Sequence, residues 1–193
     1  PGLELGAREG GLSLWMALNG MNVVCSDREN TVKTALPLHE RYAVQHKIHY
    51  QDIDATAIPF ENHFDVVIFK SILGGIGASG GFVRQKRAIE EMHKALKPGG
   101  MLMFAENLSG SFLHRFFRKR FVSWGNSWRY LNQKELKDSL HIFSKVELRC
   151  AGVIGTFGRN ETQRKCLTRV DDMLLNRICP AKWKYIGYGV AIK

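Results

Sequence analysis

Features of secreted, membrane-spanning and metal-binding proteins are scarce in this sequence. Its four cysteines, among 193 residues, are widely separated and form no C-x-x-C pair. This spacing favours reduced thiols in a cytoplasmic protein, and it gives no reason to expect a metal site. No apolar run approaches the ~18 residues of a membrane-spanning helix, and no basic-then-apolar signal segment is present. We therefore expect a cytoplasmic protein without disulfide bonds, bound metal or membrane-spanning segments.

What the sequence does contain is typical of a globular domain of ordinary size. Hydrophobic residues make up 45% of the chain and charged residues 24%. A chain of this length can bury a substantial core, and we expect a single domain over residues 1–193. The net charge is −1 over residues 1–108 and +11 over residues 109–193. Such asymmetry predicts an anionic partner on the side formed by the second half.

The start of the sequence predicts a strand, a glycine-rich turn and a helix. Leu3 and Leu5 are typical of a buried strand, and a helical apolar pattern begins at Leu12. The glycines that allow the tight turn between them are Gly6, Gly10 and Gly11. A unit of this kind presents backbone N–H groups to a ligand. Because only three residues precede Glu4, we expect the first strand to lack its beginning and an N-terminal segment to be missing.

Strands and helices alternate along the rest of the first half. Apolar runs predict further strands at residues 22–27, 48–55, 64–69 and 101–105. A predicted helix over residues 88–96 precedes the last of these and ends at Gly99–Gly100. The alternation predicts βαβ units with right-handed crossovers, and hence an α/β fold.

Five motifs follow one another along this half: Glu4–Gly11, Asp27, Asp54–Ala55 with Ile58–Phe60, Phe64–Val67 and Leu96–Gly100. Together they resemble the class I S-adenosylmethionine-dependent methyltransferases, and the resemblance covers residues 1–108. The last two motifs are most similar to the small-molecule (type 11-like) branch. Within that branch, Lys70–Gly77 resembles a subgroup from bacterial surface-polysaccharide gene clusters.

The resemblance implies a Rossmann-like, doubly wound sheet of about seven mostly parallel strands, with the last strand antiparallel and helices on both faces. Residues 1–108 then form the cofactor-binding half, and the basic residues 109–193 form the acceptor side. The last two strands are expected at 145–150 and 185–192, with a helix over 161–178 between them. In this family the segment before the first strand often helps to cover the active site.

The resemblance also implies S-adenosylmethionine as cofactor and assigns residues to its parts. Backbone N–H groups around Gly6, Ala7 and Arg8 are expected to face the amino-acid tail, and Gly10 belongs to the same loop. Glu4 is expected to support this loop and to lie near the amino group of the cofactor. As an alternative, the glycines serve only to form the turn.

Acids after the second and third strands are expected to hold the nucleoside. Asp27 suits the two ribose hydroxyls, with Arg28 beside it, unless it is a simple strand-end acid. Asp54 is expected to bind the adenine amino group and the Ala55 N–H a ring nitrogen. Asp52 replaces Asp54 if the alignment slips by two residues, and Asp54 can instead cap a short turn.

Candidate catalytic residues follow the fourth and fifth strands, since ligands bind at the carboxyl ends of strands in open α/β sheets. Lys70 can contact the cofactor or bind an acceptor carboxylate or phosphate, or be a solvated strand end. Glu106 is our first choice for a base or acceptor contact, and His114 is a weaker one because histidines on surface helices are usually solvated. The glycine-rich residues 74–81 are interpreted as a mobile loop beside the acceptor or a flexible surface connection.

Basic and aromatic residues alternate over residues 111–124. At helical spacing its apolar face comprises Leu113, Phe116, Phe117, Phe121 and Trp124. We consider a core-packing helix with a solvated basic face, a peripheral helix on anionic lipid, and a nucleic-acid surface. No nucleic-acid-binding module accompanies the segment, so we do not expect a nucleic-acid partner. Further along, Arg159, Arg164 and Lys165 either meet an acidic acceptor or form a solvated run.

The leading hypothesis is methyl transfer to oxygen of a sugar or glycan intermediate in surface-polysaccharide biosynthesis. Its acceptor is a small-molecule, sugar or lipid-linked compound that carries negative charge. A lipid or quinone methyltransferase at the membrane surface is the nearest alternative. An NAD-dependent oxidoreductase is a second, although Arg8 interrupts the G-x-G-x-x-G fingerprint and would crowd a pyrophosphate. A non-catalytic binding module is a third.

Overall fold

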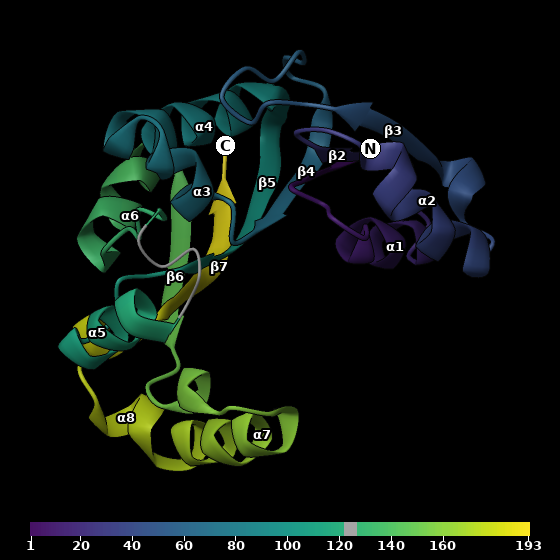
Figure 1. The fold of residues 1–193 in the computed structure, drawn as a ribbon. Helices are drawn as coiled ribbons and strands as arrows, with labels where there is room; N and C mark the ends of the chain where they lie inside the picture. Colours follow the sequence, from purple (N-terminus) through teal and green to yellow (C-terminus); the bar gives the residue numbers. More distant parts are fainter. Residues whose placement is uncertain (122–126) are drawn as a thin grey trace.

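The computed structural model describes residues 1–121 and 127–193, which contain a seven-stranded sheet (Figure 1). Its strands are β1 (Gly2–Leu5), β2 (Val23–Asp27), β3 (Ile48–Asp52), β4 (Phe64–Lys70), β5 (Leu96–Asn107), β6 (Lys145–Ala151) and β7 (Ile186–Ile192). The order across the sheet is β3-β2-β1-β4-β5-β7-β6. Neighbours from β3 to β5 pair in parallel, whereas β7 runs antiparallel between β5 and β6. The predicted α/β sheet with an antiparallel last strand is confirmed.

The chain changes direction across the sheet after β3. From β1 it moves outward to β2 and β3, and it then returns to place β4 on the other side of β1. Loops that leave the carboxyl ends of β1 and β4 therefore diverge to opposite sides. Such a switch point is where open α/β sheets bind ligands.

Helices cover both faces of the sheet (Figure 1). The helices of the described residues are α1 (Gly11–Leu18), α2 (Thr31–Arg41), α3 (Leu73–Ala78), α4 (Gly81–Ala95), α5 (Phe112–Phe121), α6 (Gln133–Ser139), α7 (Glu161–Val170) and α8 (Asn176–Ile178). Of these, α5, α7 and α8 lie beyond the lower end of the sheet in Figure 1. Single 3₁₀ turns occur at Gln45–Lys47, Leu140–Ile142, Gly155–Phe157 and Ala181–Trp183, and a π-helical turn at Asp171–Leu175 joins α7 to α8.

Two buried clusters form the core on opposite faces of the sheet. Val67 and Phe69 of β4 belong to one cluster and Ile68 to the other, as the alternation of side chains along a strand requires. The first cluster contains Ile89 of α4, and the second contains Met16 of α1. Within the described residues, no helix has the length and apolar character to cross a membrane.

Three expectations about local structure are wrong. Residues 74–81 do not form a loop, because Gly74 and Gly77 lie in α3 and Gly81 begins α4. These glycines serve close packing: a Cβ at Gly74 would lie 2.6 Å from Cε3 of Trp128, and one at Gly77 would lie 2.5 Å from Nε2 of Gln85. The helix before β5 ends at Ala95, so Gly99–Gly100 lie inside the long β5.

The third wrong expectation concerns α5. Its apolar face is not packed into the core: Phe112, Leu113, Phe116 and Phe121 are all more than half exposed. The buried residue of this helix is instead His114, which is 1% exposed. Trp124, which the sequence placed on the same face, lies outside the described residues.

Candidate active site

A cavity of about 360 Å³ opens at the carboxyl ends of β1, β2 and β4. The structure brings together at this cavity the predicted residues Gly6, Arg8, Asp27, Arg28, Asp54, Ala55 and Lys70. The predicted residues Glu4, Ala7 and Gly10 are buried behind it instead. Residues separated by more than sixty positions thus meet at the switch point of the sheet, as the topology requires.

Positive φ angles shape the loop between β1 and α1. Gly6 has φ +69°, and a Cβ at this position would lie 2.3 Å from Cγ2 of Ile72. Gly10 has φ +76° and faces His39, whose Cε1 would be 2.5 Å from a Cβ. Arg8 adopts φ +51° although it is not glycine, a conformation with a real strain energy. The two glycines therefore let the loop pack closely against Ile72 and His39.

The N–H groups of this loop are used differently from the prediction. The Ala7 N–H donates to the Ser26 carbonyl at 2.9 Å, so it does not face the tail of a cofactor. The Arg8 N–H donates to Oδ2 of Asp27, also at 2.9 Å. Asp27 thereby ties the end of β2 to the turn after β1, which no local pattern in the sequence indicates.

Glu4 is a support for the loop. It is 3% exposed, and its Oε2 accepts the Ser13 N–H at 2.6 Å, near the start of α1. Burial raises the pKa of this carboxyl above its ordinary value, against the opposing effect of the Ser13 contacts. The predicted support of the loop agrees with this geometry, and contact with an amino group stays a prediction.

Asp27 lies at the cavity wall with both oxygens oriented by backbone groups. Besides the Arg8 contact, its Oδ1 accepts the N–H of Arg28 at 2.7 Å. Each carboxylate oxygen can accept a second hydrogen bond, so two neighbouring hydroxyls can still bind. The position therefore suits the ribose contact that the sequence predicted.

Of the two acids near the end of β3, Asp54 is the one that lines the cavity. Its Oδ1 accepts from the N–H of Thr56 at 2.8 Å and from its hydroxyl at 2.7 Å, and Arg84 is 3.4 Å from its Oδ2. The Thr56 N–H is the main reason that the pKa of Asp54 is lowered. Asp54 thus caps a short turn and also faces the cavity.

Asp52, the other acid near the end of β3, has a structural role. Its Oδ1 accepts from the Thr31 N–H at 3.0 Å and from the Thr31 hydroxyl at 2.6 Å, at the start of α2. Asp52 does not line the cavity, so the alignment that placed Asp54 in the site agrees with the structure.

Sequence reasoning missed the opposite wall of the cavity. This wall includes Ile72, Ile76, Ser79, Arg84 and Trp128, which come from α3 and its two flanking residues, from α4 and from the segment before α6. The glycines at 74 and 77 were the available signal, because residues three apart share one face of a helix and small ones admit a bulky neighbour. Nothing in the sequence identifies Trp128 as that neighbour.

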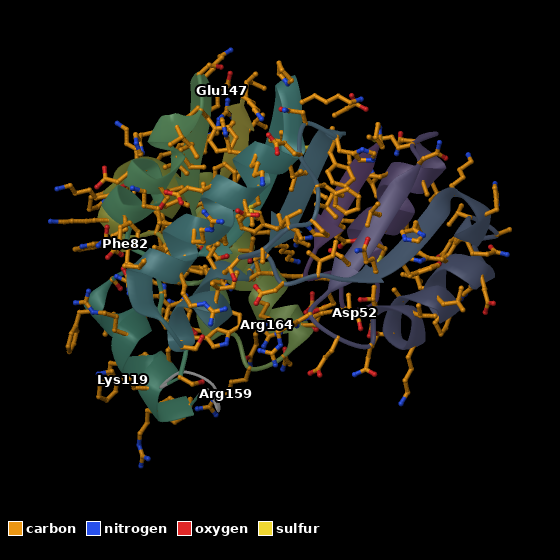
Figure 2. The ribbon with its side chains drawn as sticks, turned by 90° about the horizontal axis from the view of Figure 1, so that it is seen from above. Asp52, Phe82, Lys119, Glu147, Arg159 and Arg164 are labelled. Carbon is orange, nitrogen blue, oxygen red and sulfur yellow. The ribbon has the colours of Figure 1, made fainter. Side chains whose placement is uncertain are left out.

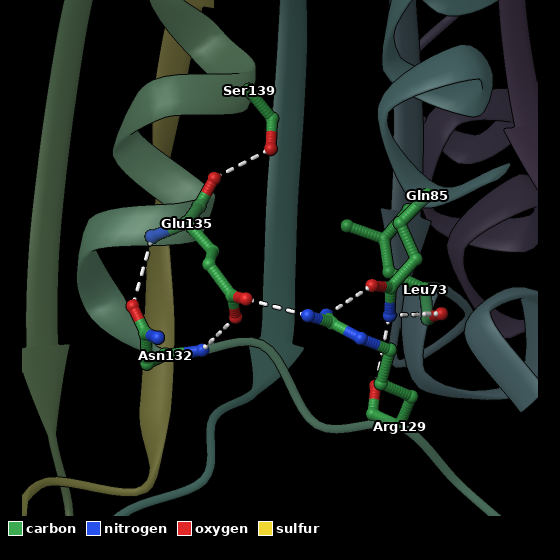
Figure 3. Close-up of polar contacts among 6 residues, drawn as sticks. All are labelled: Leu73, Gln85, Arg129, Asn132, Glu135 and Ser139. Carbon is green, nitrogen blue, oxygen red and sulfur yellow. Dashed lines mark hydrogen bonds and ion pairs between the residues drawn. The ribbon is translucent and has the colours of Figure 1, made fainter. Parts of the chain in front are cut away.

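Arg129, the residue after Trp128, is at the centre of a polar network (Figure 3). The Arg129 guanidinium donates to Oε1 of Gln85 at 2.6 Å and to Oε1 of Glu135 at 2.5 Å. Gln85 donates in turn to the carbonyls of Leu73 and Arg129, both at 2.8 Å. Glu135 also completes the capping box of α6 with Asn132. The network joins α3, α4 and α6 around one wall of the cavity.

Glu106 is 1% exposed and does not line the cavity. Its Oε2 accepts the Leu73 N–H at 2.9 Å, at the start of α3, and its Oε1 accepts the Asn107 N–H at 3.0 Å. Burial outweighs these contacts and raises the pKa of Glu106 to about 7. In this structure it positions α3, and direct contact with an acceptor does not agree with its burial.

The other two candidate catalytic residues, Lys70 and His114, line different cavities. Lys70 is exposed at the end of β4 and lines the cavity, so both of its predicted roles stay open. His114 does not line this cavity and is not solvated as expected. Burial, helped by the charge of Arg118, lowers the pKa of its imidazole to about 4. His114 belongs to a different cavity, described below.

Solved structures similar to this chain share its fold at low sequence identity. The [4+2]-cyclase SpnF is 17% identical, with a TM-score of 0.65 over 100% of this chain and 73% of its own. Phosphoethanolamine N-methyltransferase 2 of Haemonchus contortus, in complex with phosphomonomethylethanolamine and S-adenosylhomocysteine, is 19% identical with a TM-score of 0.68. That match covers 100% of this chain but 48% of that protein, so the chain spans about half its length.

A third similar structure is a methyltransferase of Methanosarcina mazei that depends on S-adenosylmethionine. It is 17% identical, with a TM-score of 0.65 over 100% of this chain and 91% of its own. No curated protein matches the sequence significantly. The family model for a methyltransferase domain, by contrast, matches residues 3–104 and confirms S-adenosylmethionine as the predicted cofactor. Because the match covers more than half of its 193 residues, this chain belongs to the methyltransferase domain family.

Proposed function

We propose that this chain transfers a methyl group from S-adenosylmethionine to an anionic small molecule, with a sugar hydroxyl of a surface-polysaccharide intermediate as the acceptor. The observation that carries the cofactor site is the placement of Asp27 and Asp54 on one cavity, from neighbouring strands. Acids suit a ligand with ribose hydroxyls, an amino group and a cationic centre. An acid after β2 could also hold the ribose of NAD⁺, so the preference for S-adenosylmethionine rests on the methyltransferase family match.

The residues present fit this cofactor. Asp27 retains acceptor capacity for the ribose, and Glu4 lies beneath the loop. When bound, S-adenosylmethionine supplies a methyl group on a sulfonium centre. The chain's contribution is to hold the reactants in line. Positioning of this kind can lower the activation free energy by roughly 7–11 kcal/mol. Lys70 stands at the cavity rim, where it can hold an acceptor anion.

Binding of S-adenosylhomocysteine and of NAD⁺, measured by thermal unfolding, tests the cofactor. A ligand at a hundred times its Kd adds ~2.7 kcal/mol to stability. We expect S-adenosylhomocysteine to stabilise the protein and NAD⁺ to leave it unchanged. Stabilisation by NAD⁺ alone would support the oxidoreductase hypothesis instead.

Replacement of Asp27 by alanine should weaken binding of S-adenosylhomocysteine by about tenfold to a hundredfold, because hydrogen bonds to a charged group are lost. Calorimetric titration measures this change. The matched control is Asp138→Ala, which removes an exposed acid of α6 that does not line the cavity. Equal affinities for the two variants would contradict the assignment of Asp27.

Methyl transfer itself needs a separate measurement, since a [4+2]-cyclase shares this fold. Label from methyl-labelled S-adenosylmethionine should pass to sugar acceptors that carry phosphate or carboxylate. A lipid or quinone acceptor at a membrane surface is the second candidate, favoured by the exposed aromatic face of α5. Label in lipid but in no sugar would favour that candidate.

A further inference from the structure

A second cavity, of about 470 Å³, lies between α5 and residues 156–164. Its aromatic wall includes Phe117 and Phe157, whose ring centroids are 5.1 Å apart, and the ring of His114, whose centroid is 4.9 Å from that of Phe157. Its charged lining consists of Arg118, Arg159 and Arg164. The cavity thus combines inclined aromatic rings with a group of guanidinium ions.

No carboxylate among the described residues lines this cavity to balance the arginines. Arg118 donates to the Leu108 carbonyl at 2.5 Å, and Arg164 donates through Nε to the Gly158 carbonyl at 3.2 Å. Both contacts hold a side chain without neutralising it. Figure 2 shows Arg159 and Arg164 on the same side of the molecule as Lys119, with Glu147 on the opposite side. The lining of the cavity therefore carries net positive charge, and of its arginines Arg118 also interacts with the buried Glu106.

Asp171 is a buried acid close to His114, and its carboxylate is already hydrogen-bonded to backbone groups. It is 1% exposed, and its carboxylate accepts the N–H groups of Val153, Ile154 and Gly155 at 2.8–3.1 Å. These bonds fix the turn that precedes Phe157. Asp171 holds one wall of the cavity in shape and leaves the arginines free to bind another anion.

His114 adds a buried donor to the same wall. Its Nδ1 accepts the Ser111 N–H at 3.0 Å, so the neutral ring carries its proton on Nε2. Among the described residues, Nε2 makes no hydrogen bond of full strength, and only a weaker contact with the backbone of Val153 is present. A poorly satisfied buried donor is unfavourable, and a ligand or water that accepts from it would remove this cost.

A cation–π contact and a tilted pair of rings connect this cavity to the first. The guanidinium of Arg118 lies 4.1 Å from the ring centroid of Tyr130, and the rings of Tyr130 and Trp128 are 6.0 Å apart. Trp128 lines the cofactor cavity. Arg118, which lines the second cavity, is therefore linked through Tyr130 to a residue that lines the first.

We propose that the second cavity binds a phosphate ester, with the phosphate on Arg159 and Arg164 and the remainder of the ligand on Phe117 and Phe157. Guanidinium forks match phosphate oxygens with paired hydrogen bonds, and aromatic faces suit a ring or chain beside it. On the proposed function, which this step presupposes, the ester is the phosphate end of the methyl acceptor. A soluble sugar phosphate and a lipid-linked phosphate share this chemistry.

Titration with phenyl phosphate, and with benzyl alcohol as its uncharged counterpart, tests the cavity directly. We expect binding of phenyl phosphate alone. The double variant Arg159→Gln/Arg164→Gln should weaken it roughly tenfold or more, as expected when bonds to charged groups are lost. The control Arg169→Gln/Arg177→Gln removes the same charge from exposed positions that do not line the cavity. If the cavity pair and the control pair of substitutions weaken phenyl phosphate binding equally, the proposal is overturned.

A second experiment, sedimentation with vesicles, distinguishes the two sources of phosphate. If the protein binds phosphatidylglycerol vesicles, and the cavity pair of substitutions abolishes this binding while the control pair does not, the phosphate belongs to a lipid. If the protein binds phenyl phosphate but not the vesicles, the phosphate belongs to a soluble ester. Binding of neither overturns the proposal. S-adenosylhomocysteine affinity, measured on the same proteins, reports separately on the proposed function, because these arginines do not line the cofactor cavity.

Discussion

Buried carboxylates in this protein accept backbone N–H groups at the starts of helices and turns. Glu4 does so for α1, Glu106 for α3 and Asp171 for the turn after β6. The N-terminus of a helix has unpaired N–H groups that a carboxylate can satisfy, and its dipole favours the negative charge. Acids that looked catalytic in the sequence therefore include some that position the walls of the site.

Glu106 should make stability depend on pH. Burial raises its pKa from 4.5 to about 7, so between these values the folded protein holds a proton that the unfolded chain has released. The free energy of unfolding is therefore highest below pH 4.5 and falls by roughly 3 kcal/mol as the pH rises to about 7. Urea unfolding of the wild type and of Glu106→Gln across pH 4.5–8 measures the difference. Titration of His114 is common to both proteins and cancels, so parallel curves would contradict the raised pKa.

At the scale of elements, two neighbouring glycines of α3, Gly74 and Gly75, differ in their surroundings. Replacement of Gly74 by alanine brings a Cβ to 2.6 Å from Trp128, and overpacking of this kind costs about 1–3 kcal/mol. Gly75→Ala is the matched control, since its Cβ would lie 3.7 Å from the same ring. Alanine there should be neutral or stabilise α3 by about 0.5–1 kcal/mol. Urea unfolding measures the stability of both variants. If Gly74→Ala and Gly75→Ala change the free energy of unfolding equally, the close contact with Trp128 is unimportant.

The hydrogen-bond network around Arg129 also fixes how the helices α3, α4 and α6 pack together. Arg129→Ala leaves Oε1 of the fully buried Gln85 without its donor and should cost about 1–3 kcal/mol. Because Trp128 is its neighbour, affinity for S-adenosylhomocysteine should fall as well. Arg115→Ala, on the exposed side of α5, should change stability by less than about 0.5 kcal/mol. Unchanged cofactor affinity in Arg129→Ala would mean that Trp128 is held by other contacts.

At the scale of the whole molecule, the two halves share one sheet and one core. β7 pairs with β5 along its length, and the larger core cluster includes Leu131, Leu136 and Ala191 from the second half. A fragment of residues 1–108 would expose this cluster and one edge of β5. We therefore predict that the fragment has no cooperative thermal transition, by calorimetry, whereas the whole chain unfolds in one. A cooperative transition in the fragment would identify it as an independent domain.

Local patterns in the sequence were enough for the strands, their alternation with helices and the acids at the ends of β2 and β3. Apolar runs and glycine turns act over a few residues, and the family motifs preserve their order, so Asp27 and Asp54 could be assigned to one site. The same local reasoning failed for residues 74–81, since a glycine-rich run is consistent with a loop or with a tightly packed helix.

Contacts between distant segments were settled only when the chain folded. Trp128 and Arg84 close the cofactor cavity, Glu106 turns from candidate base to support of α3, and His114 becomes buried beside three arginines. Each outcome depends on which side chain occupies the space next to it, and residues far apart in sequence supply that neighbour. Burial and pairing, which set the charge state and the role of a group, are therefore properties of the packed structure.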